Sequence, residues 1–408
     1  MLLCKPLTLV HLKKYFRYSV LPIIITLIVL AFSTKNEGSK TVKLFHTVSD
    51  TASIEATEPI LEKKYPIEIT QKVSNKLDSL LQRINKRHDF HGSVLVAKNG
   101  KIVYNNHIGF ADFRKKEPLN KTSLFQLASV SKQFTAAAIM MLYERNQIKL
   151  TDTVNSYFPD FPYEGVTIKN LLNHTAGLPK YFWVAEHKWK KEKAPTNSEM
   201  MRLFASSNVQ RFFKPGRNFD YSNTGYLVLA SIVEKVAGVS FSAFLEKNIF
   251  EPLEMNQSFV YNPENKNINK NHLFGYRLYK GWKHLKINNT VNDAVVGDKN
   301  VYTTSEDLFK WVLGLNNGKL ISEESLNLMY TNGETIYKRK IPYGFGFRID
   351  PKDTNIVYHH GKWNGFSTGL TQFLDENLVV IVLEHTSYSG ISSLTKKVKK
   401  IVGENLNV

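Results

Sequence analysis

The chain has 408 residues, of which 42% are hydrophobic, and a formal net charge of +18. This length and apolar content are enough to bury a large core in one two-lobed unit. The only cysteine, Cys4, excludes an internal disulfide and a catalytic cysteine in the folded part. The basic residues are scattered rather than gathered in a base-reading motif, so the charge favours an anionic cell-envelope polymer or a membrane surface over nucleic acid as a partner.

The first 33 residues predict a leader directed to a membrane. Basic residues precede an apolar run over residues 20–32, and about thirteen residues suit the core of a signal peptide but are short for a membrane span. Ala31 and Ser33 are small residues that suit a cleavage point. We therefore expect either a signal peptide or an N-terminal membrane anchor in residues 1–33. Positive charge before the apolar run predicts export across the inner membrane, to the periplasm or to an anchored position facing it.

Residues 34–66 are polar and rich in Lys, Ser, Thr and Glu, a composition typical of a spacer. The folded domain is expected over residues 67–408. It begins with apolar residues at helical spacing in residues 69–84, which predict an amphipathic helix. Two strands, 94–98 and 101–104, then flank Asn99-Gly100, the dipeptide best suited to a type I′ turn.

The stretch Ser129-Val130-Ser131-Lys132 precedes a nearly continuous apolar run over residues 134–142, which predicts a buried helix. A helix starting at Ser129 points free backbone N–H groups at the hydroxyl, and Lys132 returns to the same face. Burial destabilises a lysine ammonium, so Lys132 can serve as a neutral base near pH 7. The alternative is that Ser129 only caps the helix and Lys132 extends its amine to solvent.

The middle of the chain is expected to be mainly helical. His174 is expected to be a structural histidine at a helix end, with the helix stopping at Gly177. Aromatic and basic residues in 181–193 predict either a rim over a cleft or an ordinary solvated loop. Thr196 and Glu199 form a capping box that predicts the start of the next helix.

Two further motifs complete the set, Tyr221-Ser222-Asn223 and His359-His360-Gly361. A second Ser-x-x-Lys, at Ser393, lies in a lysine-rich stretch that is typical of the solvated face of a terminal helix. Together the three motifs supply a nucleophile, two proton carriers and a backbone oxyanion donor, which suffice for acyl transfer through a serine ester. Strand patterns surround the third motif, over residues 343–349, 356–359, 365–373 and 378–383.

These motifs resemble those of the serine β-lactamase and penicillin-binding-protein superfamily, in its branch of class C β-lactamases, D-alanyl-D-alanine carboxypeptidases and esterases. The likeness runs from about Leu77 to the C-terminus and includes residues 92–96, 99–100, 125–129, 171–179, 215–216, 251–253 and 304–308. It implies an α+β fold in which an antiparallel sheet, built from the N- and C-terminal parts and flanked by helices, carries an inserted, mainly helical lobe. The site is then expected where the lobes meet.

The resemblance also implies roles for the catalytic residues. Ser129 matches the acylated nucleophile and Lys132 the amine that helps to deprotonate it. Tyr221 matches the tyrosine that passes a proton to the leaving group, as a phenol or as a phenolate held by nearby cations. The backbone N–H groups of Ser129 and Lys362 match the oxyanion hole.

Four further residues match substrate-binding positions. Asn223 is expected to orient the substrate amide or the lysine amine, and His359 takes the place of the lysine or histidine of the third motif. Gly361 lets that strand approach the substrate closely. His360 departs from the pattern, because the family usually has Thr, Ser or Gly there, and an imidazole puts recognition of a substrate carboxylate in doubt. A purely structural His359-His360 pair, with one ring buried and one exposed, is the alternative.

The sequence therefore predicts an exported serine hydrolase acting on an ester or amide, with a peptidoglycan-related peptide or a small ester as substrate. A non-catalytic penicillin-binding-like binder or sensor and a true β-lactamase are the alternatives. No cofactor is expected. No metal is expected either, since no cysteine or carboxylate stands at metal-site spacing beside the histidine pair.

Overall fold

The computed structural model describes residues 66–263 and 270–406. The leader predicted for residues 1–33 lies outside the described residues, as does the spacer up to residue 65. The first described helix, α2 (Ile67–His88), buries one apolar face along its length. This confirms the amphipathic helix predicted over residues 69–84.

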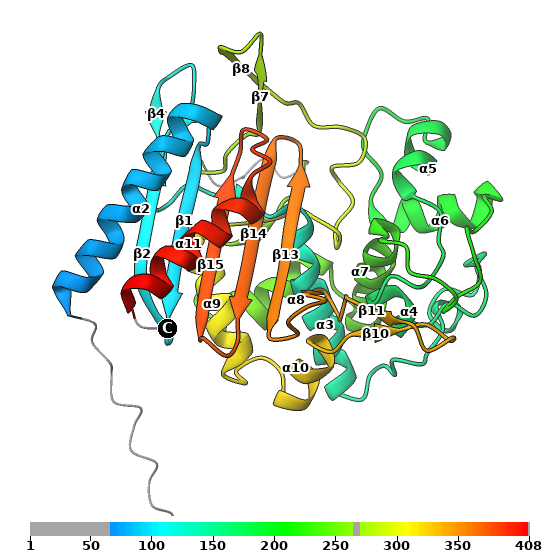
Figure 1. Ribbon diagram of the computed structural model, residues 1–408. Helices are drawn as coiled ribbons and strands as arrows, with labels where there is room; N and C mark the ends of the chain where they lie inside the picture. The colour runs from blue at the N-terminus through cyan, green and yellow to red at the C-terminus, as the bar shows by residue number, and fades with distance from the viewer. Residues whose placement is uncertain (1–65, 264–269, 407–408) are drawn as a thin grey trace, which may run out of the picture. The chain divides into compact units, whose positions relative to one another are not determined.

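A six-stranded antiparallel sheet forms the centre of this part of the chain (Figure 1). Its strand order is β12-β13-β14-β15-β1-β2. The strands are β1 (Gly92–Lys98), β2 (Lys101–Ile108), β12 (Arg348–Ile349), β13 (Ile356–Trp363), β14 (Phe366–Phe373) and β15 (Leu378–Glu384). Because β1 pairs with β15, the sheet joins the early and late parts of the chain. The predicted sheet is therefore confirmed.

The turn between β1 and β2 has the predicted chemistry. Asn99 and Gly100 have φ values of 52° and 74°, which is the positive pair that a type I′ turn requires. The strand predicted over residues 343–349 was mostly wrong, since only its last two residues form β12. Gly346 has a φ of 79°, and a Cβ there would lie 2.9 Å from the Gln133 Cα atom. The segment is therefore bent and pressed against the next layer rather than extended.

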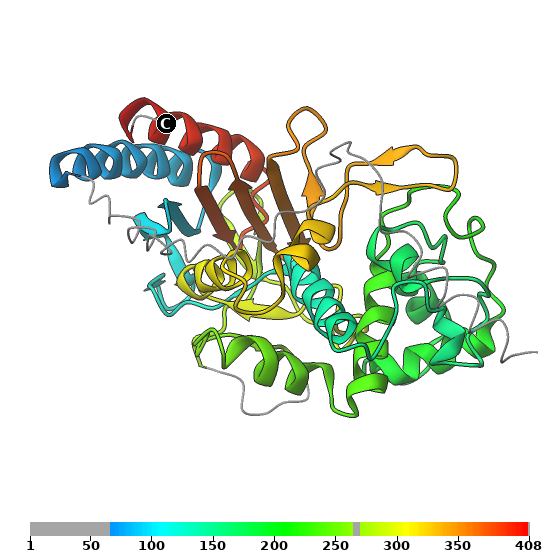
Figure 2. The ribbon, with the colours of Figure 1, turned by 90° about the horizontal axis from the view of Figure 1, so that it is seen from below.

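Helices cover both faces of the sheet. On one face, α2 and α11 (Ile391–Leu406) lie side by side (Figure 2) and enclose a core that includes Val94, Val96 and Val380. The opposite face packs against α3 (Lys132–Glu144) and α9 (Ser305–Asn316). Every residue of β1 is buried, as expected for a strand covered on two sides.

The part between β2 and β12 is mainly helical, as predicted, and its residues 168–237 lie beyond the β13 edge of the sheet (Figure 1). Thr196 and Glu199 form the predicted capping box. The remaining helices and helical turns are η1 (Ala128–Ser131), η2 (Val154–Ser156), α4 (Ile168–Leu172), α5 (Tyr181–Lys188), α6 (Asn197–Ser207), α7 (Asn223–Ala237), α8 (Phe241–Leu245), η3 (Glu246–Phe250) and α10 (Glu323–Met329).

Short strands interrupt this region, which the sequence patterns did not predict. They are β3 (Phe110–Asp112), β4 (Glu117–Pro118), β5 (Phe125–Gln126), β6 (Phe259–Val260), β7 (Tyr276–Tyr279), β8 (Lys283–Lys286), β9 (Val301–Thr303), β10 (Gly333–Glu334) and β11 (Lys340–Ile341). Strands of two to four residues are too short to show a period. Among the described residues no single helix is long and apolar enough to cross a bilayer, although the bent pair Asn223–Ala237 and Phe241–Phe250 passes that test jointly.

Candidate active site

The structure brings Ser129 and Lys132 together at the start of α3. Ser129 lies in the 3₁₀ turn η1, which runs directly into the helix. The Lys132 Nζ atom lies 3.1 Å from the Ser129 Oγ atom and donates to the Asp298 backbone oxygen at 2.7 Å. The lysine side chain is fully buried, whereas Ser129 is half-buried and open to a ligand. The pair therefore has the geometry of a hydroxyl beside its base.

Burial sets the proton affinity of this lysine. The loss of hydration lowers the pKa of Lys132 to about 7, with a further decrease from the nearby Arg348 charge and an opposing increase from Asp298. A pKa of about 7 leaves much of the amine neutral at neutral pH. Neutral Lys132 has a lone pair with which it can accept the Ser129 proton.

The backbone around the serine is held in a demanding conformation. Ala128 has a φ of 49°, which is uncommon for a residue with a Cβ atom. The Thr368 hydroxyl on β14 donates to the Leu127 carbonyl at 2.6 Å. A Cβ at Gly361 would lie 2.2 Å from that same carbonyl oxygen. Only glycine at position 361 therefore allows β13 to approach the serine turn this closely.

Tyr221 directly precedes α7, and Ser222 caps that helix. The Lys132 Nζ atom and the Arg348 guanidinium each lie 5.1 Å from the centre of the Tyr221 ring. Its hydroxyl is buried and has no hydrogen-bond partner of ordinary geometry among the described residues, although Ser129 is close enough to lower the Tyr221 pKa. Burial dominates and raises that pKa well above the usual value, against smaller decreases from Ser129 and Arg348. The resting site therefore holds a neutral phenol, not a phenolate.

Asn223 is the first residue of α7, two positions after Tyr221. Its side-chain oxygen is buried and has no partner within the described ranges. Leaving such an oxygen unpaired costs free energy, which a ligand N–H can recover. Asn223 is therefore available to a substrate amide, as the resemblance implied.

His359 lies on β13 and is fully buried. Its Nδ1 atom lies 2.8 Å from the His360 carbonyl oxygen, which can only accept, so Nδ1 carries the proton. The Nε2 atom consequently accepts from the Tyr343 hydroxyl at 3.0 Å. Burial, together with the Lys132 and Arg348 charges, holds the His359 pKa well below its usual value. His359 is therefore a neutral imidazole, whereas a lysine at this place would bring a charge.

The structure does not bring His360 to this cluster. Side chains alternate along a strand, so His360 faces away from the side that His359 and Gly361 share. Its ring lies 5.2 Å from that of Tyr358 and lines a cavity of about 700 Å³ beside α11. The Lys362 side chain is exposed, so only the backbone N–H of this residue matches its expected oxyanion role. The unusual imidazole at position 360 therefore does not replace a substrate-binding hydroxyl.

The sequence patterns missed Arg348 and misplaced the end of the helix before His174. Arg348 has no carboxylate or hydrogen-bond partner among the described residues, and no motif marked it. Helix α4 ends at Leu172 rather than at Gly177, and His174 has a φ of 60°. The His174 Nδ1 atom accepts from the Ser222 N–H at 3.1 Å, and its buried Nε2 atom has no partner in the described segments.

A second buried lysine lies on the other side of Asp298. The Lys299 Nζ atom donates to the Tyr181 hydroxyl at 2.7 Å and lies 3.4 Å from the Asp298 Oδ1 atom. The Phe182 and Trp363 rings stack at 5.1 Å over this group and join α5 to the end of β13. The segment 181–193 therefore begins as a helix that bridges to β13, rather than as a solvated loop.

One cluster has the composition of a metal site. Asp89, His91 and His284 bring three ligand atoms within 4.8 Å of one another. However, the Phe110 N–H donates to the His91 Nδ1 atom at 3.1 Å, so the proton of that neutral ring is on Nε2, which faces Asp89 at 3.0 Å. A metal would need the Nε2 lone pair. These residues form a hydrogen-bonded clamp between α2, β1 and β8, and they do not fit a metal ligand set.

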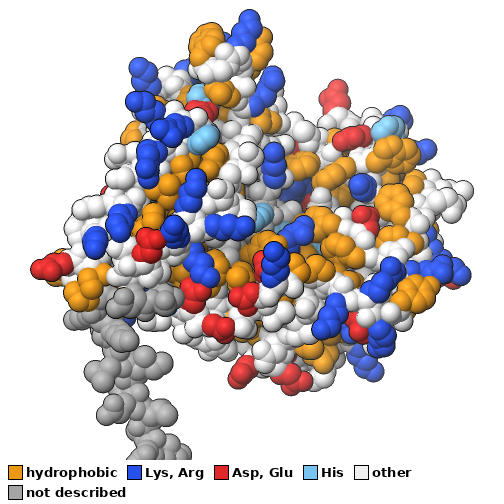
Figure 3. Space-filling view, in the orientation of Figure 1, with side chains coloured by type: hydrophobic (Ala, Val, Ile, Leu, Met, Phe, Trp, Pro, Cys, Tyr) orange, Lys and Arg blue, Asp and Glu red, His pale blue; other side chains and the backbone are white. Residues whose placement is uncertain are grey.

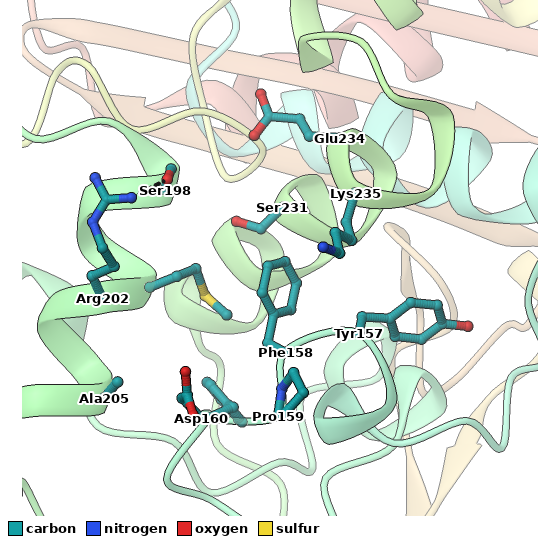
Figure 4. Close-up of a pocket in the computed structure, with 12 residues that line it drawn as sticks. Tyr157, Phe158, Pro159, Asp160, Ser198, Arg202, Ala205, Ser231, Glu234 and Lys235 are labelled. Atoms are coloured by element: carbon teal, nitrogen blue, oxygen red, sulfur yellow. Dashed lines mark hydrogen bonds between the residues drawn. The ribbon is translucent and has the colours of Figure 1, made fainter.

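A cavity of about 450 Å³ lies in the helical region, between the η2 segment, α6 and α7. Figure 4 shows Phe158 between side chains of these helices, among them Arg202 and Lys235. None of the motif residues lines it. The motif residues therefore lie elsewhere, at the junction of α3, α7 and β13.

Comparisons with known proteins match most of the folded part of the chain. The beta-lactamase family profile matches residues 77–397. Penicillin-binding protein 4* of Bacillus subtilis (strain 168) is 35% identical over 325 residues, which cover 76% of this chain and 71% of that protein. The octameric penicillin-binding protein homologue from Pyrococcus abyssi has a TM-score of 0.69 and 25% identity, covering 81% of this chain and 76% of that one.

A further solved structure shows likeness of fold alone. EstCE1, a hydrolase with promiscuous acyltransferase activity, has a TM-score of 0.68 and 21% identity, and the match covers 82% of this chain and 99% of that one. Together these structures share the α+β, β-lactamase-like fold that the sequence predicted.

Proposed function

Because the chain belongs to the beta-lactamase family, we propose that it is an exported serine hydrolase that cleaves an ester or amide through an acyl intermediate on Ser129. The observation that carries this proposal is the 3.1 Å approach of the Lys132 amine to the Ser129 hydroxyl, with burial lowering the lysine pKa to about 7. A lysine with that pKa can act as a base near pH 7. A lysine that only filled a core would have no need to face a half-exposed hydroxyl.

In the proposed acylation step, neutral Lys132 takes the proton of Ser129 while the serine oxygen forms a bond to the substrate carbonyl carbon. The carbonyl oxygen becomes an oxyanion that the Ser129 and Lys362 N–H groups stabilise. The bond to the leaving alcohol or amine then breaks, and the leaving group gains a proton through Tyr221, which is replenished by the Lys132 ammonium. Neutral Tyr221 suits this relay, because a phenol has a proton to pass on.

In the deacylation step, a water molecule replaces the leaving group. Neutral Lys132 accepts a proton from this water, directly or through the Tyr221 hydroxyl, as the water oxygen attacks the acyl carbon and the ester bond to Ser129 breaks. The Lys132 ammonium then returns a proton to the serine oxygen. The acid product leaves. The same residues therefore serve both steps in opposite directions, as microscopic reversibility requires.

The open edge of β13 supports a substrate with an extended backbone. Strand β12 pairs only with Val357 and Tyr358. Within the part of the chain that the structure describes, the β13 edge beyond them has no strand partner. An acyl group with a peptide backbone can add there as a further strand. The unpaired Arg348 guanidinium beside Tyr221 also offers a charge for a carboxylate. We therefore place a peptidoglycan-related peptide beside a small ester as candidate substrates.

The test of the nucleophile uses a fluorophosphonate probe read by intact mass. Wild-type protein is expected to gain one adduct, and Ser129→Ala is expected to gain none. Ser393→Ala is the matched control, because it removes the serine of the second Ser-x-x-Lys, which lies exposed on α11. An adduct that survives in Ser129→Ala would overturn the assignment. An adduct without turnover of any ester, peptide or lactam would instead support the non-catalytic binder.

The substrate class is tested with a panel of p-nitrophenyl esters, D-Ala-D-Ala peptides and nitrocefin. We expect ester cleavage to exceed lactam cleavage. A nitrocefin rate above that of the short-chain esters would favour a true β-lactamase. Export is tested separately by cell fractionation and by sequencing the mature N-terminus, which distinguishes a cleaved leader from an uncleaved anchor.

A further inference from the structure

The hairpin of β7 and β8 projects beyond the end of the central sheet (Figure 1). Lys280, Gly281 and Trp282 form its turn, and the first two have φ values of 52° and 76°. Its base is fixed to the sheet, because the Tyr276 N–H donates to the His385 carbonyl at 2.8 Å. A base held to the sheet and a short three-residue turn make the tip a defined protrusion rather than a loose loop.

Large apolar side chains at this tip face solvent. Trp282 is 73% exposed, Leu278 43% and Tyr279 42%. Phe274, at the base, is also exposed. Single exposed apolar residues are ordinary, but a tryptophan this open, with a leucine and a tyrosine on one protruding turn, indicates a contact surface.

The same hairpin carries only positive charge. Residues 274–292 include Arg277, Lys280, Lys283 and Lys286 and no Asp or Glu. None of these four cations has an ion-pair partner among the described residues. The Lys286 Nζ atom lies 2.9 Å from the centre of the Phe274 ring, and Lys280 lies near the Tyr279 ring. Basic and aromatic side chains are thus interleaved along the hairpin, which lies at the top of the view in Figure 3.

We propose that this hairpin tip docks on the surface of a bilayer that contains anionic lipids. Tryptophan and tyrosine favour the interface, where the ring is dehydrated and its polar atom keeps a partner. Lysine and arginine gain from the negative surface potential, by an amount that increases with each charge close to the headgroups. The proposal is independent of the predicted leader, because it concerns residues 274–292 alone.

Other occupants fit this surface less well. A soluble polyanion would satisfy the four cations but leave Trp282 and Leu278 in water. A second copy of the chain, meeting tip to tip, would bring eight cations together without an acidic partner. A bilayer interface offers both an apolar layer and negative charge, which is the combination that the tip displays.

The test uses the full chain and vesicles with brominated acyl chains, which quench nearby tryptophan emission. The five tryptophans are Trp183, Trp189, Trp282, Trp311 and Trp363. None lies in residues 1–65, so quenching does not report directly on the predicted leader. We expect quenching with anionic vesicles and much less with zwitterionic ones. Trp282→Phe should remove it, whereas Trp183→Phe, which changes another exposed tryptophan, should retain it.

Charge is tested with a matched pair of double variants. Lys280→Glu/Lys283→Glu is expected to raise the lipid concentration for half-maximal quenching about tenfold or more. The control, Lys235→Glu/Lys247→Glu, changes the net charge by the same amount at exposed positions of α7 and η3. It should leave the lipid concentration for half-maximal quenching unchanged. Circular dichroism checks that each variant is folded.

Three results would overturn the proposal. The first is full quenching in Trp282→Phe, and the second is equal quenching with neutral and anionic vesicles. The third is a wild-type dimer in lipid-free sedimentation that Trp282→Ala dissociates, which would assign the tip to self-association. Binding of soluble polyphosphate by wild type and Trp282→Ala alike, with no quenching by vesicles, would assign it to a polyanion instead.

Discussion

Two buried lysines, Lys132 and Lys299, lie on either side of Asp298. They differ in the groups that contact their amines. Lys132 contacts a backbone carbonyl and the Ser129 hydroxyl, whereas Lys299 lies beside the Asp298 carboxylate and the Tyr181 hydroxyl. Burial lowers the pKa of both side chains. Without a carboxylate contact, a buried lysine gives up its proton easily, while one beside a carboxylate remains charged and holds structure. The comparison predicts opposite consequences of removing each amine.

Lys132→Met should have the largest effect. We expect kcat/KM to fall about a thousandfold, because the general base is lost. Stability should rise by roughly 2 kcal/mol below pH 7, since the variant no longer buries an ammonium. This gain should shrink as the pH rises from 7 to the ordinary lysine pKa. In that range Lys132 of the wild type binds a proton in the unfolded state but not in the folded state, so the stability of the wild type increases with pH. Denaturation in urea at several pH values measures it, and a loss of stability at pH 6 would contradict the comparison.

Lys299→Met should show the reverse pattern. It leaves the Asp298 carboxylate buried without its cation, which costs about 3 kcal/mol of unfolding free energy. The double variant Asp298→Asn/Lys299→Met should recover part of that loss, because neither charge then remains. Urea denaturation compares the three proteins. If Lys299→Met were as stable as wild type yet unable to form the Ser129 adduct, Lys299 would belong to the catalytic group instead.

The pH profile sharpens the assignment of Lys132. Activity should rise tenfold per pH unit up to about pH 7, as the amine becomes neutral. Arg348→Gln should move this rising part of the pH–activity curve, the acidic limb, to higher pH. The reason is that the guanidinium charge lowers the Lys132 pKa. Arg348→Lys keeps the charge and serves as the control. A limb that stays in place in Arg348→Gln would show that another group titrates there.

The smallest effect is expected at position 360. Because its ring faces α11, His360→Ala should change kcat/KM less than about threefold, within the range typical of residues outside a site. His359→Ala is the matched neighbour and should reduce activity more, since it removes the partner of Tyr343. Ester hydrolysis measures both. A larger loss in His360→Ala than in His359→Ala would reverse the strand orientation assigned to them.

The sequence predicted the parts of this molecule that depend on local patterns. The α2 face, the Asn99-Gly100 turn, the Thr196 capping box and the antiparallel sheet were confirmed, because periodicity, turn chemistry and family likeness each specify them. The approach of Lys132 to Ser129 followed from helical spacing.

Contacts between distant segments escaped prediction. Arg348 lies at a two-residue strand with no motif around it, and it reaches the Tyr221 ring only through the tertiary fold. His360 was assigned to the site because it is part of the His359-His360-Gly361 motif. On a strand, however, neighbouring side chains point to opposite faces, so consecutive residues of a motif need not share a site. Short strands such as β7 and β8 lacked a readable period.

The hydrogen bond from Thr368 to the Leu127 carbonyl spans 241 residues of chain. Contacts of such long sequence separation form late, after much loop entropy has been lost. The serine turn and β14 therefore acquire their working geometry only when nearly the whole chain has emerged and collapsed. A fragment ending before β14 is consequently expected to lack this hydrogen bond and to form no adduct at Ser129 with the fluorophosphonate probe.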